Sequence, residues 1–118
     1  MGVAEHHVEH FRAQRVKIMP IEKAEEATMF AALPLRAIGD NRLSALELRT
    51  LAAIAYHDRF SLVRNGPGCF ASHQTLAGRL GCHYTRVSTS VHHLVELGYV
   101  QSHVNPERRR NRIYRVVY

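Results

Sequence analysis

The stretch SHQTLAGRLGCHYTRVSTSVHHLVELG, residues 72–98, decides the fold of this chain. Ser72 is a typical helix N-cap, and the apolar residues that follow it recur at helical spacing. Gly81 then occupies the position just past the helix end, where glycine is common. A second apolar stripe starts within a few residues and is closed by a second glycine. The two stripes consist of Leu76, Ala77 and Leu80, and then of Val87, Val91, Leu94 and Val95. The stretch therefore predicts helices over 73–80 and about 83–97, separated by a tight turn.

A further helix is predicted upstream, over residues 45 to about 58. Ser44 and Glu47 fit a capping box, in which the serine hydroxyl accepts a hydrogen bond from an orphan backbone amide and the glutamate reaches back. Apolar residues follow at helical spacing, namely Leu48, Leu51, Ala52 and Ala55. The sequence Asn-Gly-Pro-Gly at 65–68 has strong turn chemistry. Residues 69–71 are too few for a helix and favour an isolated strand.

The C-terminal part of the chain predicts a basic β-hairpin. Residues 99–104 alternate loosely like a strand, 105–107 are turn-like, and 113–118 form a second β-rich run. The tip and the returning arm carry four arginines, Arg108, Arg109, Arg110 and Arg112. The tight turn between the second and third helices is the signature of a helix–turn–helix motif. The expected fold is therefore mainly α-helical with a small β-hairpin: a winged helix–turn–helix, with a three-helix core plus the wing.

Two regions follow from this reading. Residues 41–118 are expected to form the winged helix–turn–helix domain. Residues 1–40 are expected to form an N-terminal extension, either a helical arm or a partly disordered segment. Within the extension, residues 21–33 predict a short helix that Pro34 would end, because the residue before a proline is disfavoured in the helical region.

Composition narrows the class of protein. Of the 118 residues, 46% are hydrophobic and 22% are charged, which is ordinary for a globular domain. No apolar run is long enough to cross a bilayer, and residues 1–10 lack the pattern of a secretory signal. Cys69 and Cys82 do not make a disulfide framework, and Cys82 is interpreted as a small buried residue rather than a redox switch. We therefore expect a cytoplasmic protein with reduced thiols.

The net charge of +6 is concentrated away from the N-terminus. Residues 1–40 carry a net −1, residues 41–85 a net +3 and residues 86–118 a net +4. Clustered cations suit a polyanion, because phosphates that they neutralise release counterions. The alternative from charge alone is a solvated basic face that keeps the protein in solution.

The helix over 83–97 has the surface that a DNA-reading helix needs. With its valine–leucine stripe buried, its opposite face presents Thr85, Ser88, Thr89 and His92, with Arg86 and His93 at the margins. No carboxylate occurs on this face before Glu96. A helix that enters the major groove needs a hydrogen-bonding face free of large aliphatic side chains. The pattern therefore predicts a helix that binds double-stranded DNA, with Tyr84 nearer the core side but still able to reach the duplex.

Residues 72–100 resemble bacterial winged helix–turn–helix regulators, above all the MarR-type (multiple-antibiotic-resistance) superfamily and, second, related replication-initiator domains. The matching positions are Leu76-Ala77 in the first motif helix, Leu80-Gly81 at the turn, Val87 in the reading helix, and the closing Leu94, Leu97 and Gly98. Pro-Glu-Arg-Arg-Arg at 106–110 is similar to the wing tip of that superfamily, with Glu in place of Asp. The resemblance covers about residues 43–118.

The resemblance implies a set of DNA-binding residues. Contacts to bases or nearby phosphates fall on His83, Tyr84, Thr85, Ser88 and Thr89. Contacts to the DNA backbone fall on Ser72, Gln74 and Thr75. The wing arginines Arg108, Arg109, Arg110 and Arg112 fall where the superfamily reaches the minor groove or flanking phosphates. His92 on the same helix face and Arg86 at its margin complete the predicted set.

The chain departs from the MarR-type pattern in two ways. His83, Tyr84 and Thr85 stand where arginines often begin the reading helix, so a bidentate readout of guanine by arginine is not assured. The chain also ends at Tyr118, without the C-terminal helix through which MarR-type proteins dimerise. A homodimer would therefore use residues 1–40 or the first helix of the domain.

The leading hypothesis is a sequence-specific transcription regulator that binds double-stranded DNA, is cytoplasmic and nucleoid-associated, and acts as a homodimer. Two alternatives stay open: the DNA-binding domain of a plasmid- or phage-type replication initiator, and a winged-helix adaptor that binds protein. No nucleophile elbow or phosphate loop is present, so we expect no enzyme activity. His6, His7 and His10 lack the zincin spacing and no Cys-x-x-Cys occurs, so neither a metal nor a cofactor is expected.

Overall fold

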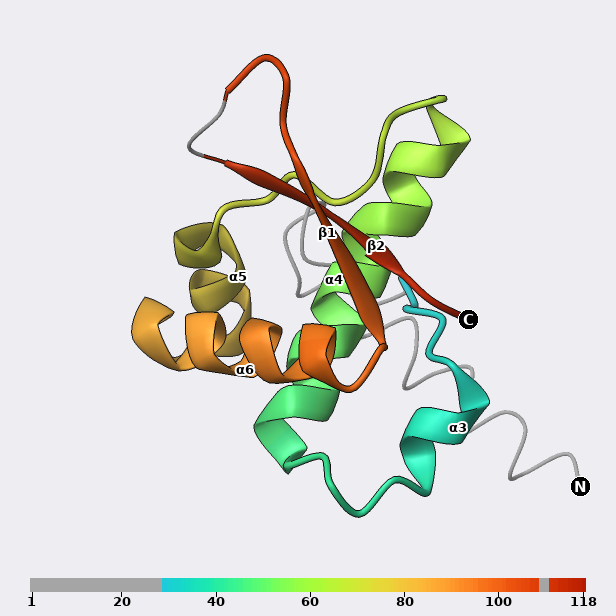
Figure 1. The fold of residues 1–118 in the computed structure, drawn as a ribbon, viewed down its shortest axis with the longest axis vertical. Coiled ribbons are helices and arrows are strands. Elements are labelled where there is room, and N and C mark those ends of the chain that lie inside the picture. The colour runs from blue at the N-terminus through green and yellow to red at the C-terminus, as the bar shows by residue number, and fades with distance from the viewer. Residues whose placement is uncertain (1–28, 109–110) are drawn as a thin grey trace, which may run out of the picture. The chain divides into compact units, whose positions relative to one another are not determined.

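The computed structural model describes residues 29–108 and 111–118. Within them the elements run in the order α3 (Leu35–Ile38), α4 (Ala45–Val63), α5 (His73–Leu80), α6 (Tyr84–Glu96), β1 (Val100–Val104) and β2 (Arg112–Val116) (Figure 1). The chain divides into two compact units, Met1–Phe30 and Ala31–Tyr118, and the second contains all of these elements. This unit is mainly helical with a small hairpin, so the predicted winged-helix architecture is confirmed. None of the described helices is long and apolar enough to pass through a bilayer.

α4 begins as predicted but ends later. The capping box is present, because Ser44 Oγ accepts from the Glu47 amide at 3.1 Å and Glu47 Oε1 accepts from the Ser44 amide at 2.8 Å. The predicted end near Asp58 is wrong, since the helix continues to Val63. Nothing in residues 59–63 breaks a helix. The chain turns only where Asn65 takes a positive φ of 57°, immediately before the Gly-Pro-Gly sequence.

The two helices of the motif lie where they are predicted. Ser72 caps α5, with its hydroxyl accepting from the Thr75 amide at 3.1 Å. Gly81 ends α5 in the left-handed region at φ 69°, a conformation that costs glycine little. α6 begins after His83, whose ring nitrogen caps the Thr85 amide at 3.3 Å, and ends before Leu97.

The hairpin pairs β1 and β2 in antiparallel register, with Val100 opposite Val116. Cys69 adds an isolated bridge to Tyr114, so the strand expected over residues 69–71 is present as a single pair. The two backbone hydrogen bonds of this bridge are both 2.8 Å long. The hairpin packs on α4, and β1 also meets α6, while α4, α5 and α6 pack on one another. The wing is therefore attached to the three-helix core chiefly through α4.

The core lies where the three helices and the hairpin meet. Its centre consists of side chains with almost no exposed surface, namely Leu51, Ile54, Leu76, Val87, Leu94 and Tyr99. The predicted inward stripes of the two motif helices are among the buried residues, except Val95, which is half-buried. Burying one such side chain stabilises a fold by about 1.5–3 kcal/mol. The same stripes that fix the core therefore fix which face of α6 points outward.

α3 is an element that the sequence did not predict. The helix expected over 21–33 is wrong at its described end, because residues 29–33 are not helical, and the rest of it lies outside the described residues. α3 instead starts after Pro34, which is its N-cap. A proline suits the start of a helix and disfavours helical backbone in the residue before it.

The segment around α3 is held against the C-terminal end of the domain. Arg36 donates from Nη2 to the Val117 carbonyl at 2.7 Å, and its guanidinium lies 4.2 Å from the centre of the Tyr99 ring. Tyr99 in turn donates to Asp40 Oδ2 at 2.7 Å. Hydrogen bonds from Arg42 and from Tyr99 hold the pKa of Asp40 well below its usual range. The second compact unit begins at Ala31.

Candidate nucleic-acid interface

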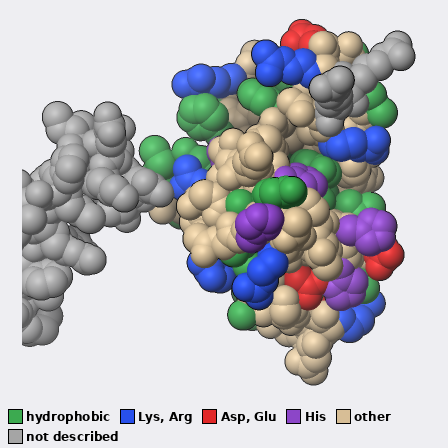
Figure 2. All heavy atoms as spheres, turned by 90° about the vertical axis from the view of Figure 1, so that its left-hand side faces the viewer, with side chains coloured by type: hydrophobic (Ala, Val, Ile, Leu, Met, Phe, Trp, Pro, Cys, Tyr) green, Lys and Arg blue, Asp and Glu red, His purple; other side chains and the backbone are tan. Residues whose placement is uncertain are grey.

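The predicted DNA-binding residues belong to three elements: the exposed face of α6, the start of α5 and the tip of the wing. In Figure 1, both motif helices and the wing tip lie toward the left-hand side of the molecule. Figure 2 views that side, where histidine and basic side chains are spread among hydrophobic side chains, a few acidic ones, and other side chains and backbone. The sequence therefore supplies this face with hydrogen-bonding and basic groups from separate parts of the domain.

α6 exposes a polar face, as its pattern predicts. Val87, Val91 and Leu94 are buried on the inner side. The exposed residues of the helix and its cap include His83, Tyr84, Thr85, Arg86, Thr89 and His92. Tyr84, which periodicity placed nearer the core, is 46% exposed and its ring centre lies 4.6 Å from that of His83. The start of α6 therefore offers an aromatic pair beside its hydroxyl groups.

The hydroxyls of α6 fall into two kinds. Thr85 and Thr89 are exposed, and Thr89 Oγ1 donates back to the Thr85 carbonyl at 3.1 Å, which leaves its lone pairs facing solvent. Ser88 is half-buried, and its hydroxyl donates to the Tyr84 carbonyl at 3.1 Å. Ser88 Oγ also lies 2.7 Å from His73 Nδ1. Ser88 is thus satisfied inside the domain, and the two threonines are better placed to meet bases.

His73 connects three elements and was not among the predicted site residues. Its Nδ1 faces Ser88 of α6, and its Nε2 lies 2.8 Å from the hydroxyl of Tyr114 in β2. The His73 and Tyr114 rings stack with centres 5.8 Å apart. Burial lowers the pKa of His73 and raises the pKa of Tyr114, so both side chains are held neutral near pH 7. The partners are distant in the sequence, so no local pattern could have revealed this contact.

The start of α5 presents exposed polar side chains. Ser72, Gln74 and Thr75 are exposed there. The Ser72 hydroxyl satisfies the Thr75 amide and lies 2.9 Å from the Thr75 hydroxyl. The first amides of a helix otherwise lack partners within it, and the helix dipole favours an anion at that end. These residues can therefore meet a phosphate, as the resemblance implies.

The wing carries arginines in two situations. Arg108 is exposed near the tip. Arg112 braces the hairpin, because its Nε donates to Ser102 Oγ at 2.7 Å and its Nη2 donates to the Ser102 carbonyl at 3.2 Å. The predicted contacts at Arg109 and Arg110 lie outside the described residues. Arg112 is still exposed, so bracing the hairpin and meeting a phosphate are compatible roles.

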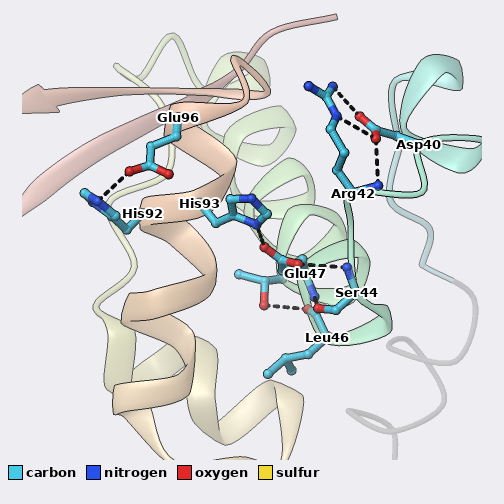
Figure 3. Close-up of polar contacts among 9 residues, drawn as sticks. Asp40, Arg42, Ser44, Leu46, Glu47, His92, His93 and Glu96 are labelled. Carbon is cyan, nitrogen blue, oxygen red and sulfur yellow. Dashed lines mark hydrogen bonds and ion pairs between the residues drawn. The ribbon is translucent and has the colours of Figure 1, made fainter.

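Acidic residues near α6 are each paired with a histidine (Figure 3). Glu47, which completes the capping box of α4, also contacts His93 Nδ1 and so ties the start of α4 to α6. Glu96 lies 3.0 Å from His92 Nε2 one helical turn away. Both partners of the second pair are exposed, so it adds at most about 1 kcal/mol to stability. The His93–Glu47 contact instead orients α6 on α4.

Two half-buried histidines make stability depend on pH. Burial lowers the pKa of His57 and of His73 from the ordinary 6.5. Below about pH 6.5 the unfolded chain therefore binds more protons than the folded one, and the free energy of unfolding falls as pH drops. Asp40 and Glu47, whose pKa values are also lowered, lose their contributions only below their ordinary values of 3.8 and 4.5. We expect the urea midpoint of unfolding to decrease as the pH is lowered from about 7 to about 5, and to decrease less in His73→Gln. An equal decrease in the unchanged protein and in the variant would contradict this.

Comparison with known proteins agrees with this geometry. The family model described as a helix-turn-helix domain matches residues 41–100, slightly more than half of the chain. No curated protein matches the sequence. A solved structure of a mutant of MepR, a MarR-family protein of S. aureus, is similar to this one, with a TM-score of 0.51 and 10% sequence identity. The match covers 98% of this chain and 61% of that one, so this chain spans about three fifths of that chain's length. At this identity the likeness is one of fold, and it confirms the winged helix–turn–helix that the resemblance implies.

Proposed function

Because the chain belongs to the helix–turn–helix domain family, we propose that it is a transcription regulator that binds double-stranded DNA and catalyses no reaction. The observation that carries this proposal is the convergence of three features on one side of the domain. These are the polar face of α6, the open start of α5 and the arginine-bearing wing. A side with hydrogen-bond donors and cations, set on a helix that fits the major groove, is suited to a duplex.

In the proposed complex, α6 lies in the major groove. Thr85 and Thr89 contact base edges, and Tyr84 assists them from the first turn. Ser72, Gln74 and Thr75 meet the backbone at the start of α5, and the wing arginines meet flanking phosphates or the minor groove. Phosphate contacts supply most of the affinity, whereas base contacts supply the sequence preference. Because His83, Tyr84 and Thr85 stand where arginines often begin the reading helix, DNA shape contributes to the choice of site.

The proposal includes a homodimer in the cytoplasm, associated with the nucleoid. A two-fold dimer would bind a pseudo-palindrome with half-sites about one helical turn apart. Selection of duplexes from a random pool, with the mass of the free and bound protein measured, tests DNA binding, symmetry and stoichiometry together. One symmetric site with two chains is the expected result. A tandem array would favour a replication initiator, and no bound duplex at low salt would overturn DNA binding.

Replacing both exposed threonines of α6 should blur the sequence preference. We expect the double variant Thr85→Ala, Thr89→Ala to bind the selected site roughly 10- to 100-fold more weakly than the unchanged protein, because base contacts are lost. Binding to unrelated duplexes should change little, because no phosphate contact is removed. Fluorescence anisotropy with the selected site and a scrambled one measures both. A uniform loss on both duplexes would show that the threonines do not read bases.

A further inference from the structure

We propose that His73 is a positioning residue that holds the reading helix α6 and the wing in one mutual arrangement, so that both reach the duplex together. The inference rests on the proposed function. It concerns three side chains joined by two hydrogen bonds, Ser88, His73 and Tyr114, which are called the His73 bridge below. Ser88 belongs to α6, His73 opens α5 and Tyr114 lies in β2, so the bridge joins all three elements of the candidate interface.

The hydrogen bonds of the bridge form a consistent set. The Ser88 hydroxyl donates its one proton to the Tyr84 carbonyl, so it accepts the contact from His73 Nδ1. His73 therefore carries its proton on Nδ1, and Nε2 has a free lone pair that accepts from the Tyr114 hydroxyl. A neutral imidazole thus satisfies both neighbours at once. No other neutral side chain of similar size offers a donor and an acceptor on opposite sides of a rigid ring.

Few other contacts hold the wing to the motif helices. Within residues 29–108 and 111–118, neither α5 nor α6 packs extensively on β2; the hairpin is attached through α4, and α6 meets only β1 closely. A pocket of about 140 Å³ lies beside the bridge and is lined among others by Ser72, His73, Arg112 and Tyr114. The His73 bridge forms part of the wall of this pocket, where the start of α5 meets β2. Opening the bridge therefore removes the side-chain link between β2 and the two motif helices, while the attachment of the hairpin to α4 remains.

The bridge should matter only when the wing and α6 bind the same duplex. A preorganised interface avoids the cost of ordering its parts on binding. Without the bridge, the wing has to be ordered during binding, which lowers affinity for a duplex long enough to reach it. A duplex that ends before the wing gains nothing from the bridge. The bridge therefore predicts a length-dependent effect, which distinguishes it from a direct base contact by Ser88.

The test uses the full chain and two duplexes that share the selected core site. One extends under the wing and the other ends before it. Ser88→Ala or Tyr114→Phe should each weaken the long duplex about two- to tenfold, the loss expected for one hydrogen bond, and leave the short duplex nearly unchanged. The double variant should bind like either single variant, since breaking either link opens the same bridge. The dependence on salt should not change, because no charge is removed.

A conservative variant adds a second check. His73→Asn keeps an amide near the Nδ1 position and so retains the Ser88 link alone. It should bind like Tyr114→Phe, and adding Tyr114→Phe to it should have no further effect. The urea midpoint of each variant confirms that it is folded.

Two results would overturn the inference while the proposed function stands. One is a double variant in which the two losses multiply, because independent residues behave in that way. The other is an equal loss on both duplexes for Ser88→Ala, because Ser88 would then contact a base. If the unchanged protein binds neither duplex, the proposed function fails and the inference fails with it.

Discussion

Asp58→Ala should cost the domain about 1–3 kcal/mol of unfolding free energy, the penalty expected when a buried backbone amide loses its hydrogen-bond partner. Asp58 is 2% exposed within α4. Its Oδ2 accepts from the Val116 amide at 2.9 Å, and its Oδ1 lies 3.0 Å from Arg115 Nε. The second contact lacks the alignment of a hydrogen bond, so its attraction is mainly between charges. The substitution leaves a buried amide and a partly buried guanidinium without their partner, which is the costly outcome.

Urea unfolding measures the loss, and two further variants identify its source. Asp58→Asn keeps an oxygen for the Val116 amide and removes only the charge, so it should lose less than Asp58→Ala. Glu96→Ala removes the carboxylate of the exposed pair with His92 and should change stability by no more than about 1 kcal/mol. A loss for Asp58→Ala as small as that of Glu96→Ala would show that the wing is not anchored through Asp58.

Local patterns predicted those parts of the fold that depend on local physics. Ser72 and Gly81 bound α5 because capping and left-handed backbone are properties of single residues. The capping box at Ser44 places the start of α4 for the same reason. The end of α4 was missed because residues 59–63 are compatible with a helix and carry no signal that ends one. The chain turns only at Asn65, where φ is positive. α3 was missed because four residues carry too little periodicity, and its place is fixed by contacts of Arg36 with the far end of the chain.

The candidate site was predictable to the same extent. Amphipathic spacing shows which side of α6 is exposed, and the structure agrees at Thr85 and Thr89. Ser88 lies at the edge of that side, where a shift of one helical position determines whether a side chain faces solvent or contacts a neighbouring element. His73 and Tyr114 come together only when β2 is placed beside the start of α5 in the folded domain, and sequence spacing does not reveal that contact. Sequence therefore predicts which groups face outward, and tertiary contacts decide which of them are already occupied.

Replacing Arg108 and Arg112 together by glutamine should weaken binding to every duplex by about one to two orders of magnitude at low salt. Each arginine that neutralises a phosphate releases about one counterion, so the slope of log affinity against log salt should become shallower by about two. The loss should be the same for specific and unrelated sequences, because phosphates carry no base information. Anisotropy titrations at several salt concentrations measure both quantities.

The single variants separate the two arginines. Arg108 is exposed near the tip, so Arg108→Gln should change the slope by about one. Arg112 also donates to Ser102, so a loss for Arg112→Gln combines a phosphate contact with a looser hairpin. Ser102→Ala removes one acceptor of that brace without removing charge and should leave the slope unchanged. Arg59→Gln, which removes an exposed charge on α4 near Tyr118, is the matched control. If Arg59→Gln changes the slope as much as Arg108→Gln, net charge rather than wing contact governs the affinity.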